Sequence, residues 1–490
     1  MGNINRLGRD AFLISLTRAL NLLITLVTAM LLVRFRTLEE YGTYSQINTV
    51  VSIASAVFMF GLPNSLNYFI AKADNQEEKD SFLSIYYIFI TVLSATIGII
   101  LYFGRGLISA YYSNELIEAF WYCLLVLPWA QTITFGISNM LVATNNVKRL
   151  VIYNISRSFC FLLLVILVQL MNGDFYTYMV FYIILDAIFT LIVYAEALKV
   201  IERLYFSLDF RKIKTILAFS IPIGLSSAAS TLNIQLDHLL IGRFFDTETL
   251  AVYTNAAKQL PFTIIAHSFT AVLMPQMTRF FKVGKNEEAV VVWGRAIELN
   301  AIILFFCSMA CIVFAPQMIT ILYSEKYISG VPVFRIYAFV LLFRITYFGM
   351  VLNTTGRTRY VLYSSIAALV VNVLLNYVLL LYLGPVGAAL ATVIALAVIG
   401  MAQLLLSAKF INVPFSNLFP WKRLVYIVLI NSLFGFIGYM LLFILRIGTD
   451  AKDIIMAMIL GAVLLVTYSL IMRKRVIALT KGLTVNQGGL

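Results

Sequence analysis

The sequence predicts an all-α integral membrane protein with about fourteen transmembrane helices, arranged as two parallel six-helix lobes plus two C-terminal helices. Three observations lead to this fold class. Of the 490 residues, 61% are hydrophobic and only 12% are charged, whereas a soluble globular protein carries roughly 25% charged residues. Apolar runs long enough to cross the hydrocarbon core recur along the whole chain. The two halves of the chain also resemble each other at an offset of about 210 residues.

The apolar runs can be placed one by one, because charged residues, Gly, Pro or Asn interrupt them. Only LGPVG separates the eleventh run from the twelfth, so about twelve to fourteen spans are expected. The expected spans are residues 11–33, 44–71, 82–103, 117–143, 150–171, 175–198, 215–241, 249–280, 296–322, 332–354, 360–383, 386–408, 424–445 and 454–472.

No connection between these spans is long enough to form a domain. The longest inner one, residues 199–214, is expected to lie at the lipid headgroups as an amphipathic cytoplasmic linker. It separates an N-terminal six-helix lobe at 1–198 from a C-terminal six-helix lobe at 215–408. Residues 409–490 supply the two extra helices, 13 and 14, and a cytoplasmic tail. The first apolar run follows two arginines, as in a signal peptide, but it is too long and lacks a small-residue cleavage site, so we expect it to stay attached.

The net charge of +13 is explained by its distribution along the chain. With the N-terminus in the cytoplasm, and with Arg279 at the inner end of the eighth span counted as inner, the inner segments hold 24 of the 36 Lys and Arg residues, the outer loops hold 7 and the spans hold 5. This positive-inside asymmetry predicts a multi-pass protein of the cytoplasmic (inner) membrane with both termini in the cytoplasm. The basic excess therefore reflects topology, and we expect no nucleic-acid partner.

Two pairs of segments carry the internal repeat. LLVRFRTLEEYGTYS at 31–45 matches LLIGRFFDTETLAVYT at 239–254, and LVATNNVKRLVIYN at 141–154 matches VLNTTGRTRYVLYS at 351–364. A proline in the second span of each half, in GLPNSL and LMPQMT, is a third anchor. An even number of spans separates the copies, so the halves share one orientation and are expected to be related by a pseudo-two-fold axis along the membrane normal, as in transporters with parallel repeats.

The sequence lacks the motifs of enzymes and metal proteins. The four cysteines lie inside apolar runs without metal-ligand spacing, so we expect no disulfide and no metal. There is no G-x-x-x-x-G-K-[ST] phosphate loop, no H-E-x-x-H and no G-x-S-x-G. No outer loop is large enough for the catalytic site of a membrane glycosyltransferase or polymerase. We therefore expect neither an enzyme nor a cofactor.

Cations within the spans are the first candidates for a binding site, because a charge in hydrocarbon costs at least about 2.5–3.5 kcal/mol and normally faces protein or water. Arg18 begins a polar stripe on one helical face, which would be penalised against lipid. The stripe continues at Asn21, Thr25 and Thr28. Arg18 therefore either faces a cavity or snorkels to the cytoplasmic headgroups, and Lys258 in the eighth span has the same two interpretations.

Arg344 lies near the middle of the tenth span, where neither interface is within easy reach. It either serves transport or pairs internally with Asp186 or Glu298. His267 lies nine residues beyond Lys258, on the opposite side of the helix, and a hydrogen-bonded packing role is the alternative to a functional one. We also count His267 and Asp186 as candidates for ion or proton coupling.

Asp237 ends a second polar stripe, formed with two serines and Asn233 of the seventh span. It is either a third candidate for proton or cation coupling or an ordinary carboxylate at the outer rim. The two remaining intramembrane arginines, Arg157 and Arg335, are expected to snorkel to the interfaces.

The segment LAVYTNAAKQ, followed by LMPQMTRFF, resembles the eighth-span signature of the multidrug/oligosaccharidyl-lipid/polysaccharide exporter superfamily. EEYGTYS in the first half and YLGPVGAALAT at 382–392 resemble elements of its polysaccharide biosynthesis (O-antigen type) flippase branch. The resemblance extends over nearly the whole chain. It implies a V-shaped pair of six-helix lobes around a central cavity, with two extra helices.

The same resemblance implies a substrate and a site. In the polysaccharide branch, intramembrane cations line the cavity and engage the pyrophosphate of an undecaprenyl-linked sugar. Arg18 and Lys258 match such cations by position, and Arg344 is the third cation that we assign to this site. An anionic pyrophosphate needs paired donors, which arginine supplies as a bidentate fork.

The expected function is therefore a flippase that moves an undecaprenyl-pyrophosphate-linked oligosaccharide repeat unit across the cytoplasmic membrane by alternating access, for O-antigen or capsule synthesis. Its expected partners are this lipid-linked glycan, membrane lipids and a polysaccharide polymerase. One alternative is a lipid II flippase. The other is a multidrug or cation extruder of the same fold, which should carry carboxylates as its main cavity charges.

Overall fold

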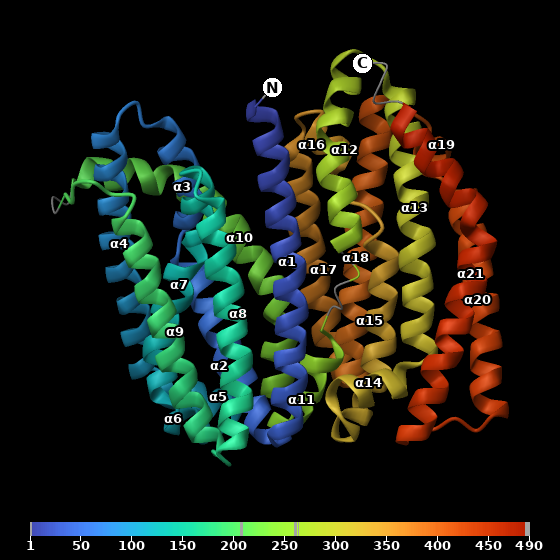
Figure 1. Ribbon diagram of the computed structural model, residues 1–490, viewed down its shortest axis with the longest axis horizontal. Coiled ribbons are helices and arrows are strands. Elements are labelled where there is room, and N and C mark those ends of the chain that lie inside the picture. The colour runs from blue at the N-terminus through green and yellow to red at the C-terminus, as the bar shows by residue number, and fades with distance from the viewer. Residues whose placement is uncertain (1, 206–208, 259–261, 263, 486–490) are drawn as a thin grey trace. The chain divides into compact units, whose positions relative to one another are not determined.

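The computed structural model describes residues 2–205, 209–258, 262 and 264–485, and all regular structure among them is helical (Figure 1). The contacts between helices divide the chain into two compact units, Met1–Ala251 and Val252–Leu490. Each unit has its own hydrophobic core. The boundary between the units falls inside one short helix, α11.

In the first unit, long helices alternate with short ones at the turns of the chain. The helix α7 lies at the centre of this unit and packs on α2, α3, α4, α8 and α9. The helices are α1 (Gly2–Phe35), α2 (Leu38–Phe58), α3 (Leu62–Lys72), α4 (Gln76–Phe103), α5 (Arg105–Tyr112), α6 (Leu116–Ala119), α7 (Trp121–Ala143), α8 (Val147–Leu170), α9 (Phe175–Leu198) and α10 (Phe210–Phe244).

In the second unit, α13 is the central helix, with α12, α15, α20 and α21 packed around it. In the most apolar stretch of α13, 78% of the residues are buried, which explains why this helix lacks a polar face. The elements are α11 (Thr247–Ala256), α12 (Ile264–Lys282), α13 (Asn286–Val313), α14 (Ala315–Tyr323), the 3₁₀ turn η2 (Glu325–Gly330), α15 (Val331–Phe343), α16 (Met350–Thr354), α17 (Thr358–Leu383), α18 (Pro385–Ile411), α19 (Phe415–Leu418), α20 (Trp421–Ile444) and α21 (Ala451–Val485).

The helices confirm the predicted fold class with a slightly lower count of spans. Within the described residues, 12 helices are long and apolar enough to cross a membrane, and 13 if α2 and α3, bent by 43°, form one span. The stretch expected as one further span, residues 249–280, is divided into α11 and α12. Part of the connection between these two helices lies outside the described residues.

The internal repeat is confirmed by local geometry. Helices α2 and α11 begin 209 residues apart, and α8 and α17 begin 211 residues apart. At the turn before α8, the Asn146 amide donates to the Leu141 carbonyl at 2.7 Å, and at the turn before α17 the Arg357 amide donates to the Leu352 carbonyl at 2.7 Å. The residue before each donor has left-handed backbone, with φ of 57° and 74°. Matching turns in both halves follow from matching sequence.

The bend between α2 and α3 is packed directly against α10. Gly61 at this bend has a φ of 69°, and a Cβ on it would come within 2.5 Å of the Gly224 nitrogen. A Cβ on Gly224 would in turn lie 2.3 Å from the Phe60 carbonyl carbon. A side chain at either glycine would therefore collide with backbone, so the close approach of α10 to the bend requires glycine on both sides.

These contacts group α10 with the first unit, whereas the repeat makes α10 the first helix of the second copy. The two divisions differ because the first is based on packing contacts and the second on the internal sequence repeat. The division at 1–198, 199–214, 215–408 and 409–490 rests on the repeat and stays a prediction.

The expected linker begins as an irregular segment tied to the start of α4. The buried carboxylate of Asp80 accepts hydrogen bonds from the Glu202 and Arg203 amides at 3.2 and 2.9 Å, and the Tyr205 amide donates to Ser84 Oγ. Residues 206–208 of this linker lie outside the described residues.

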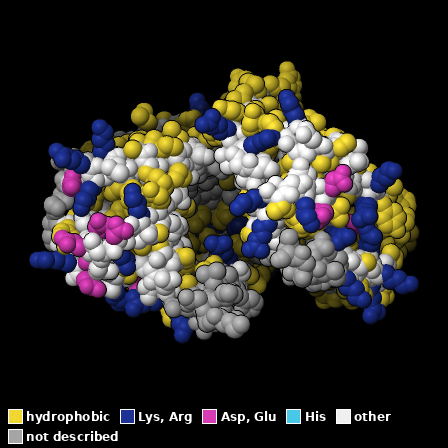
Figure 2. Space-filling view, turned by 90° about the horizontal axis from the view of Figure 1, so that it is seen from above, with side chains coloured by type: hydrophobic (Ala, Val, Ile, Leu, Met, Phe, Trp, Pro, Cys, Tyr) yellow, Lys and Arg dark blue, Asp and Glu magenta, His cyan; other side chains and the backbone are white. Residues whose placement is uncertain are grey.

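Basic side chains gather at the end of each unit that carries the connections assigned to the cytoplasm. On the face seen in Figure 2, Lys and Arg side chains are more frequent than Asp and Glu side chains. In the first unit these connections join α3 to α4, α7 to α8 and α9 to α10; in the second they join α12 to α13 and α16 to α17 (Figure 1). The charge asymmetry counted along the sequence therefore corresponds to one end of each unit.

Candidate functional site

Two spans of the second unit are interrupted, and a cation stands at each interruption. Helix α11 ends at Ala256 and α12 begins at Ile264; Lys258 lies between them, and residues 259–261 and 263 are outside the described part of the chain. Residues 344–349, of which Arg344 is the first, separate α15 from α16. Irregular backbone at membrane depth occurs where it is buried in protein or lines a cavity, and interrupted helices form substrate sites in transporters. These two interruptions are the candidate site.

The interruption at Arg344 is held in a defined conformation by α13. The side-chain amide of Asn300 donates to the Ile345 carbonyl at 2.8 Å, and the indole N–H of Trp293 donates to Thr346 Oγ1 at 2.8 Å. Trp293 and Asn300 are both buried. Backbone groups released from a helix and buried away from water must find such partners. The sequence of α13 therefore supports the interruption in the neighbouring span.

Arg344 lies at the C-terminal end of α15, whose 13 residues place it roughly 20 Å along the helix axis from the start of that helix. Its Nε is buried and has no hydrogen-bond partner among the described residues. The two internal partners considered from the sequence are engaged elsewhere: Asp186 with Arg157, and Glu298 with arginines of α20 and α21. Among the residues that the structure describes, no carboxylate forms an ion pair with Arg344.

Lys258 is half-buried directly after the last turn of α11, and its amide donates to the Asn255 carbonyl at 3.2 Å. Within the described part of the chain, its ammonium forms no ion pair. A cation at a helix C-terminus interacts favourably with the helix dipole, typically by about 0.3–1 kcal/mol. That structural role and a role in binding an anion are compatible, because the dipole satisfies only part of the charge.

The internal repeat supplies a comparison for both cations. At the offset between the starts of α2 and α11, Lys258 corresponds to Thr49, which lies inside the continuous helix α2. At the offset between the starts of α8 and α17, Arg344 corresponds to Ile133, inside the continuous helix α7. Thus the second copy has both the interruptions and the cations, and the first copy has neither at these positions.

Arg18, the third cation assigned from the sequence, has an exposed side chain on α1 in the first unit. Of its polar stripe, Asn21 accepts a hydrogen bond from Ser158 of α8 at 3.3 Å, and Thr28 Oγ1 donates to the Ile24 carbonyl of α1 itself. The structure thus brings Lys258 and Arg344 into one unit, and the membership of Arg18 in their site stays a prediction.

The three candidates for ion coupling have different surroundings. The Asp186 carboxylate on α9 is 1% exposed and receives Arg157 Nη2 from α8 at 2.7 Å, so Arg157 is not the snorkelling residue expected from the sequence. Asp237 on α10 is also buried and has other polar contacts, and the choice between ion coupling and a carboxylate at the outer rim stays a prediction. The backbone of His267 lies in α12, and its side chain is outside the described residues.

Sequence reasoning missed the interruptions themselves and the pairing of Arg157 with Asp186. A hydropathy profile does not reveal a helix break whose free backbone groups are hydrogen-bonded by neighbouring side chains. Pro261, which has no amide hydrogen for a helical hydrogen bond, was a local signal for the first break. For the ion pair, the signal was the position of two opposite charges on consecutive antiparallel spans.

A duplicated helical membrane protein with interrupted helices, and with cations at the helix ends that form no ion pair within the described residues, has the architecture of a membrane transporter. The chain belongs to the polysaccharide biosynthesis protein family, whose model matches residues 7–281. A second family model, MatE, matches residues 222–378. This confirms the superfamily expected from the signature around Lys258.

Relatives of known name agree with this family. The chain is 23% identical over 197 residues to the capsular polysaccharide biosynthesis protein CapF of Staphylococcus aureus, covering 39% of this chain and 50% of CapF. It is 20% identical over 232 residues to the probable low-salt glycan biosynthesis flippase Agl15 of Haloferax volcanii, covering 46% of this chain and 49% of Agl15. The chain thus matches about half the length of each of these relatives.

Solved structures share the fold. The lipid II flippase MurJ in an inward closed conformation matches with a TM-score of 0.77 and 17% identity, over 95% of this chain and 100% of that one. An inward-facing multidrug resistance transporter of the MATE family matches with a TM-score of 0.66 and 18% identity, over 80% of this chain and 94% of that one. At these identities the similarity establishes the fold alone.

Proposed function

We propose that this protein is a flippase that moves an undecaprenyl-pyrophosphate-linked oligosaccharide repeat unit across the cytoplasmic membrane by alternating access, for the synthesis of a surface polysaccharide such as O-antigen or capsule. The observation that carries this proposal is the presence of Lys258 and Arg344 at the two interrupted spans of the second unit, without carboxylate partners among the described residues. Two such cations suit a pyrophosphate, which is anionic and rich in acceptor oxygens.

Each residue has a distinct role in this proposal. Arg344 supplies the planar fork that binds two phosphate oxygens at once, and it is buried enough that water competes weakly. Lys258 supplies a compact charge with three rotatable donors. Arg18 is the third cation that we assign to the headgroup, as the family resemblance implies. The sugar would occupy the cavity, and the lipid tail would remain among the membrane lipids.

The two interruptions also suit a moving site. A helix that is already divided can change the angle between its parts without breaking further backbone hydrogen bonds. In the second unit, α11 and α15 could tilt while α13 retains its contacts with α20 and α21. Coupling to an ion gradient would use buried carboxylates: protonation of Asp186 would release Arg157, and Asp237 and His267 are the other candidates.

The names of the relatives support this substrate class. CapF is named for capsular polysaccharide biosynthesis, and Agl15 is named as a glycan biosynthesis flippase. The coverage of the MurJ match favours lipid II as the second candidate, since lipid II is also a lipid-linked glycan with an anionic headgroup. The extruder alternative is less favoured, because the carboxylates of Asp186 and Glu298 are each paired with arginine rather than open to a cationic drug.

The proposed location is the cytoplasmic membrane, with both termini in the cytoplasm and a polysaccharide polymerase receiving the product outside. We expect a cysteine placed at Lys285 to be shielded from an impermeant reagent in intact cells, and one placed at Lys326 to be labelled. The background would lack the four native cysteines. Labelling at 285 alone would reverse the topology.

The functional test replaces each cation in turn. We expect Arg344→Ala and Lys258→Ala to abolish glycan export and to make the lipid-linked oligosaccharide accumulate on the cytoplasmic face, with normal amounts of protein in the membrane. Arg344→Lys should restore export in part, because it returns the charge without the fork. Lys282→Ala, at the exposed end of α12, is the matched control and should export normally. Wild-type export by both alanine variants would remove the site.

A further inference from the structure

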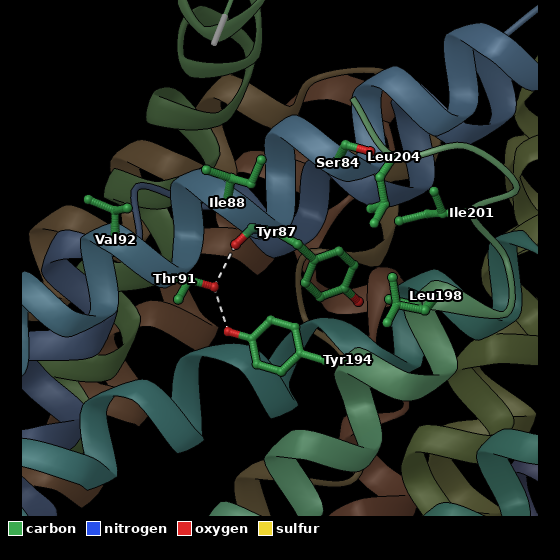
Figure 3. A pocket seen from close by; sticks show the side chains of 10 residues that line it. Ser84, Tyr87, Ile88, Thr91, Val92, Tyr194, Leu198, Ile201 and Leu204 are labelled. Atoms are coloured by element: carbon green, nitrogen blue, oxygen red, sulfur yellow. Dashed lines mark hydrogen bonds between the residues drawn. The ribbon is translucent and has the colours of Figure 1, made fainter. Parts of the chain in front are cut away.

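An open pocket lies in the first unit, away from both interruptions. It has a volume of about 340 Å³ and lies between α4, α9 and the segment that follows α9 (Figure 3). Both helices are candidate membrane spans. The pocket is lined by Ser84, Tyr87, Ile88, Thr91, Val92, Tyr194, Ala197, Leu198, Ile201 and Leu204.

The polar atoms of this pocket are already engaged with one another. Thr91 Oγ1 donates to the Tyr87 carbonyl and is hydrogen-bonded to the Tyr194 hydroxyl, as Figure 3 shows. The Tyr194 hydroxyl also accepts from the Trp129 indole at 3.1 Å, and the Tyr87 hydroxyl donates to the Met140 sulfur. A sugar or phosphate inside the pocket would therefore lose its water without gaining partners. The chemistry of the lining selects a hydrocarbon chain.

The pocket is accessible from the side of the unit. Val92 and Leu198, on its two walls, are 61% and 53% exposed. From Ser84 to Val92 the lining rises eight residues, or roughly 12 Å along the axis of α4. In a membrane-spanning helix pair, an open apolar wall of this depth faces acyl chains rather than water.

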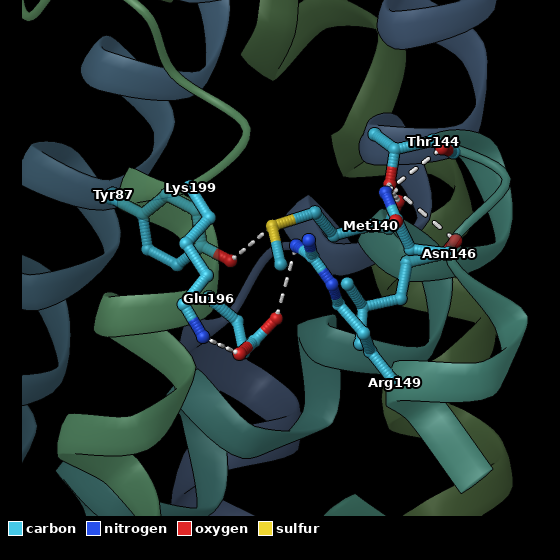
Figure 4. A network of polar contacts seen from close by, with 8 residues as sticks. Tyr87, Met140, Thr144, Asn146, Arg149, Glu196 and Lys199 are labelled. Carbon is cyan, nitrogen blue, oxygen red and sulfur yellow. Dashed lines mark hydrogen bonds and ion pairs between the residues drawn. The ribbon is translucent and has the colours of Figure 1, made fainter. Parts of the chain in front are cut away.

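Two cations adjoin lining residues in the sequence, and a third contacts the turn of α4 before the pocket. Lys199 directly follows Leu198, Arg203 directly precedes Leu204, and Lys212 Nζ donates to Ser81 Oγ, one turn of α4 before Ser84. Figure 4 shows the neighbouring network, in which the Glu196 carboxylate contacts Arg149 at 3.5 Å and Lys199 at 2.5 Å.

The charges at this end do not balance. In the network of Figure 4 one carboxylate serves two cations, and the carboxylate of Asp80 is used by backbone amides of the linker. Glu202 and Asp209 add negative charge, as do Asp74, Glu77 and Glu78 near the start of α4. The three connections at this end of the first unit, residues 72–80, 144–149 and 196–214, together carry nine Lys and Arg against seven Asp and Glu. An apolar slot with a net basic rim is complementary to a lipid that has an anionic head and an acyl tail.

We propose that this pocket binds one acyl chain of an anionic phospholipid, with the lipid phosphate held among Lys199, Arg203 and Lys212. A chain in this pocket would touch Ile201 and Leu204, so the bound lipid would help to fix the start of the linker between the two six-helix repeats. This site is separate from the cations at the interrupted spans and does not depend on which substrate they bind.

The test compares lipid binding by the full-length protein in detergent. Native mass spectrometry would use phosphatidylglycerol and phosphatidylcholine with the same acyl chains. We expect the wild type to bind one phosphatidylglycerol at least tenfold more tightly than phosphatidylcholine. Leu198→Trp, which fills the mouth of the pocket, should abolish this bound lipid. Ile188→Trp is the matched control, because it lies on the same helix with a similarly exposed side chain outside the pocket.

A second wall and the rim are tested independently. Val92→Trp should repeat the effect of Leu198→Trp from α4, which keeps the test valid if one variant fails to fold. Lys199→Ala combined with Arg203→Ala should remove the preference for phosphatidylglycerol while leaving weak binding of both lipids. Phosphatidylglycerol with a photoreactive acyl chain should label peptides of α4 and α9.

Three results would overturn the proposal. The first is undiminished phosphatidylglycerol binding by both tryptophan variants. The second is equal binding of the two lipids by the wild type, which would indicate only the ordinary lipid shell. The third is competition by undecaprenyl phosphate at equal concentration. If it displaces phosphatidylglycerol from the wild type but not from the residual sites of Leu198→Trp, the occupant of the pocket is the tail of a polyprenyl lipid. None of these results depends on glycan export.

Discussion

Replacing Glu298 should show how much more a buried ion cluster contributes to stability than an exposed ion pair. Its carboxylate, 4% exposed on α13, receives Arg475 Nε at 2.5 Å and Nη2 at 2.8 Å from α21, and Arg423 Nη1 at 2.8 Å from α20. One carboxylate therefore joins the two C-terminal spans to the central helix of the second unit. Glu298→Gln keeps the shape of the side chain and removes its charge.

The expected loss follows from burial. Breaking a fully buried ion pair from one side costs about 3–5 kcal/mol, because the remaining charge loses its partner. Here the arginines are 55% and 42% exposed, so water compensates in part and we expect a loss of about 2–3 kcal/mol. For a unit of this size, that loss lowers the unfolding midpoint by about 4–12 °C.

The measurement is thermal unfolding of the purified protein in detergent, together with proteolysis of residues 412–420, the connection before α20. We expect Glu298→Gln to unfold earlier and to be cleaved faster in this connection. Glu288→Gln is the control: it makes the same chemical change on the same helix, but its pair with Lys285 is half-exposed on both sides. Such a pair contributes about 0–1 kcal/mol. Equal midpoints for the two variants would refute the view that Glu298 fastens the C-terminal helices.

Three further outcomes test other features. Lys258→Glu should block export of the lipid-linked glycan more severely than Lys258→Gln. A like charge roughly 4 Å from the pyrophosphate costs on the order of 4 kcal/mol at an effective dielectric of about 20. Equal export by the two variants, or dye resistance conferred by the wild type, would favour the extruder. Gly224→Ala should destabilise the first unit by about 1–3 kcal/mol through collision with the bend before α3, measured against Gly294→Ala, where nothing lies within 4 Å of the added Cβ. Asp186→Asn should leave the partly exposed Arg157 without its counterion and lower the unfolding midpoint of the first unit. If Asp186 couples protons, the same variant should make export insensitive to the pH gradient. An unchanged midpoint would show that the ion pair contributes little.

The sequence predicts most of the fold, because each membrane-spanning helix is signalled by one continuous run of apolar residues in the sequence. The runs at 175–198 and 360–383 correspond to α9 and α17 within two residues at each end. The repeat was also readable, because the turn before α8 and the turn before α17 use local hydrogen bonds that a short matching segment specifies. By contrast, the role of a polar residue such as Asn300 depends on the helix that it contacts, and that contact could not be predicted from the sequence.

The candidate site was readable in its residues but not in its geometry. Lys258 and Arg344 stand out as charges in apolar runs, and the structure places both of them at helix ends. That placement depends on partners far along the chain, such as Trp293 for the segment after Arg344. Likewise, the contact of Arg157 depends on the packing of α8 on α9. This packing brings the arginine to the buried carboxylate of Asp186, so its side chain does not extend toward the headgroups.

The contact of Trp293 with the interruption after Arg344 gives the protein a built-in optical reporter. Trp293 is one of four tryptophans, is fully buried, and donates its indole hydrogen to Thr346. If the other three are replaced by phenylalanine, the emission of the remaining indole should respond to any movement of this segment, because a lost hydrogen bond and admitted water both shift its wavelength. Any such movement could then be followed in vesicles, in real time and without an attached dye.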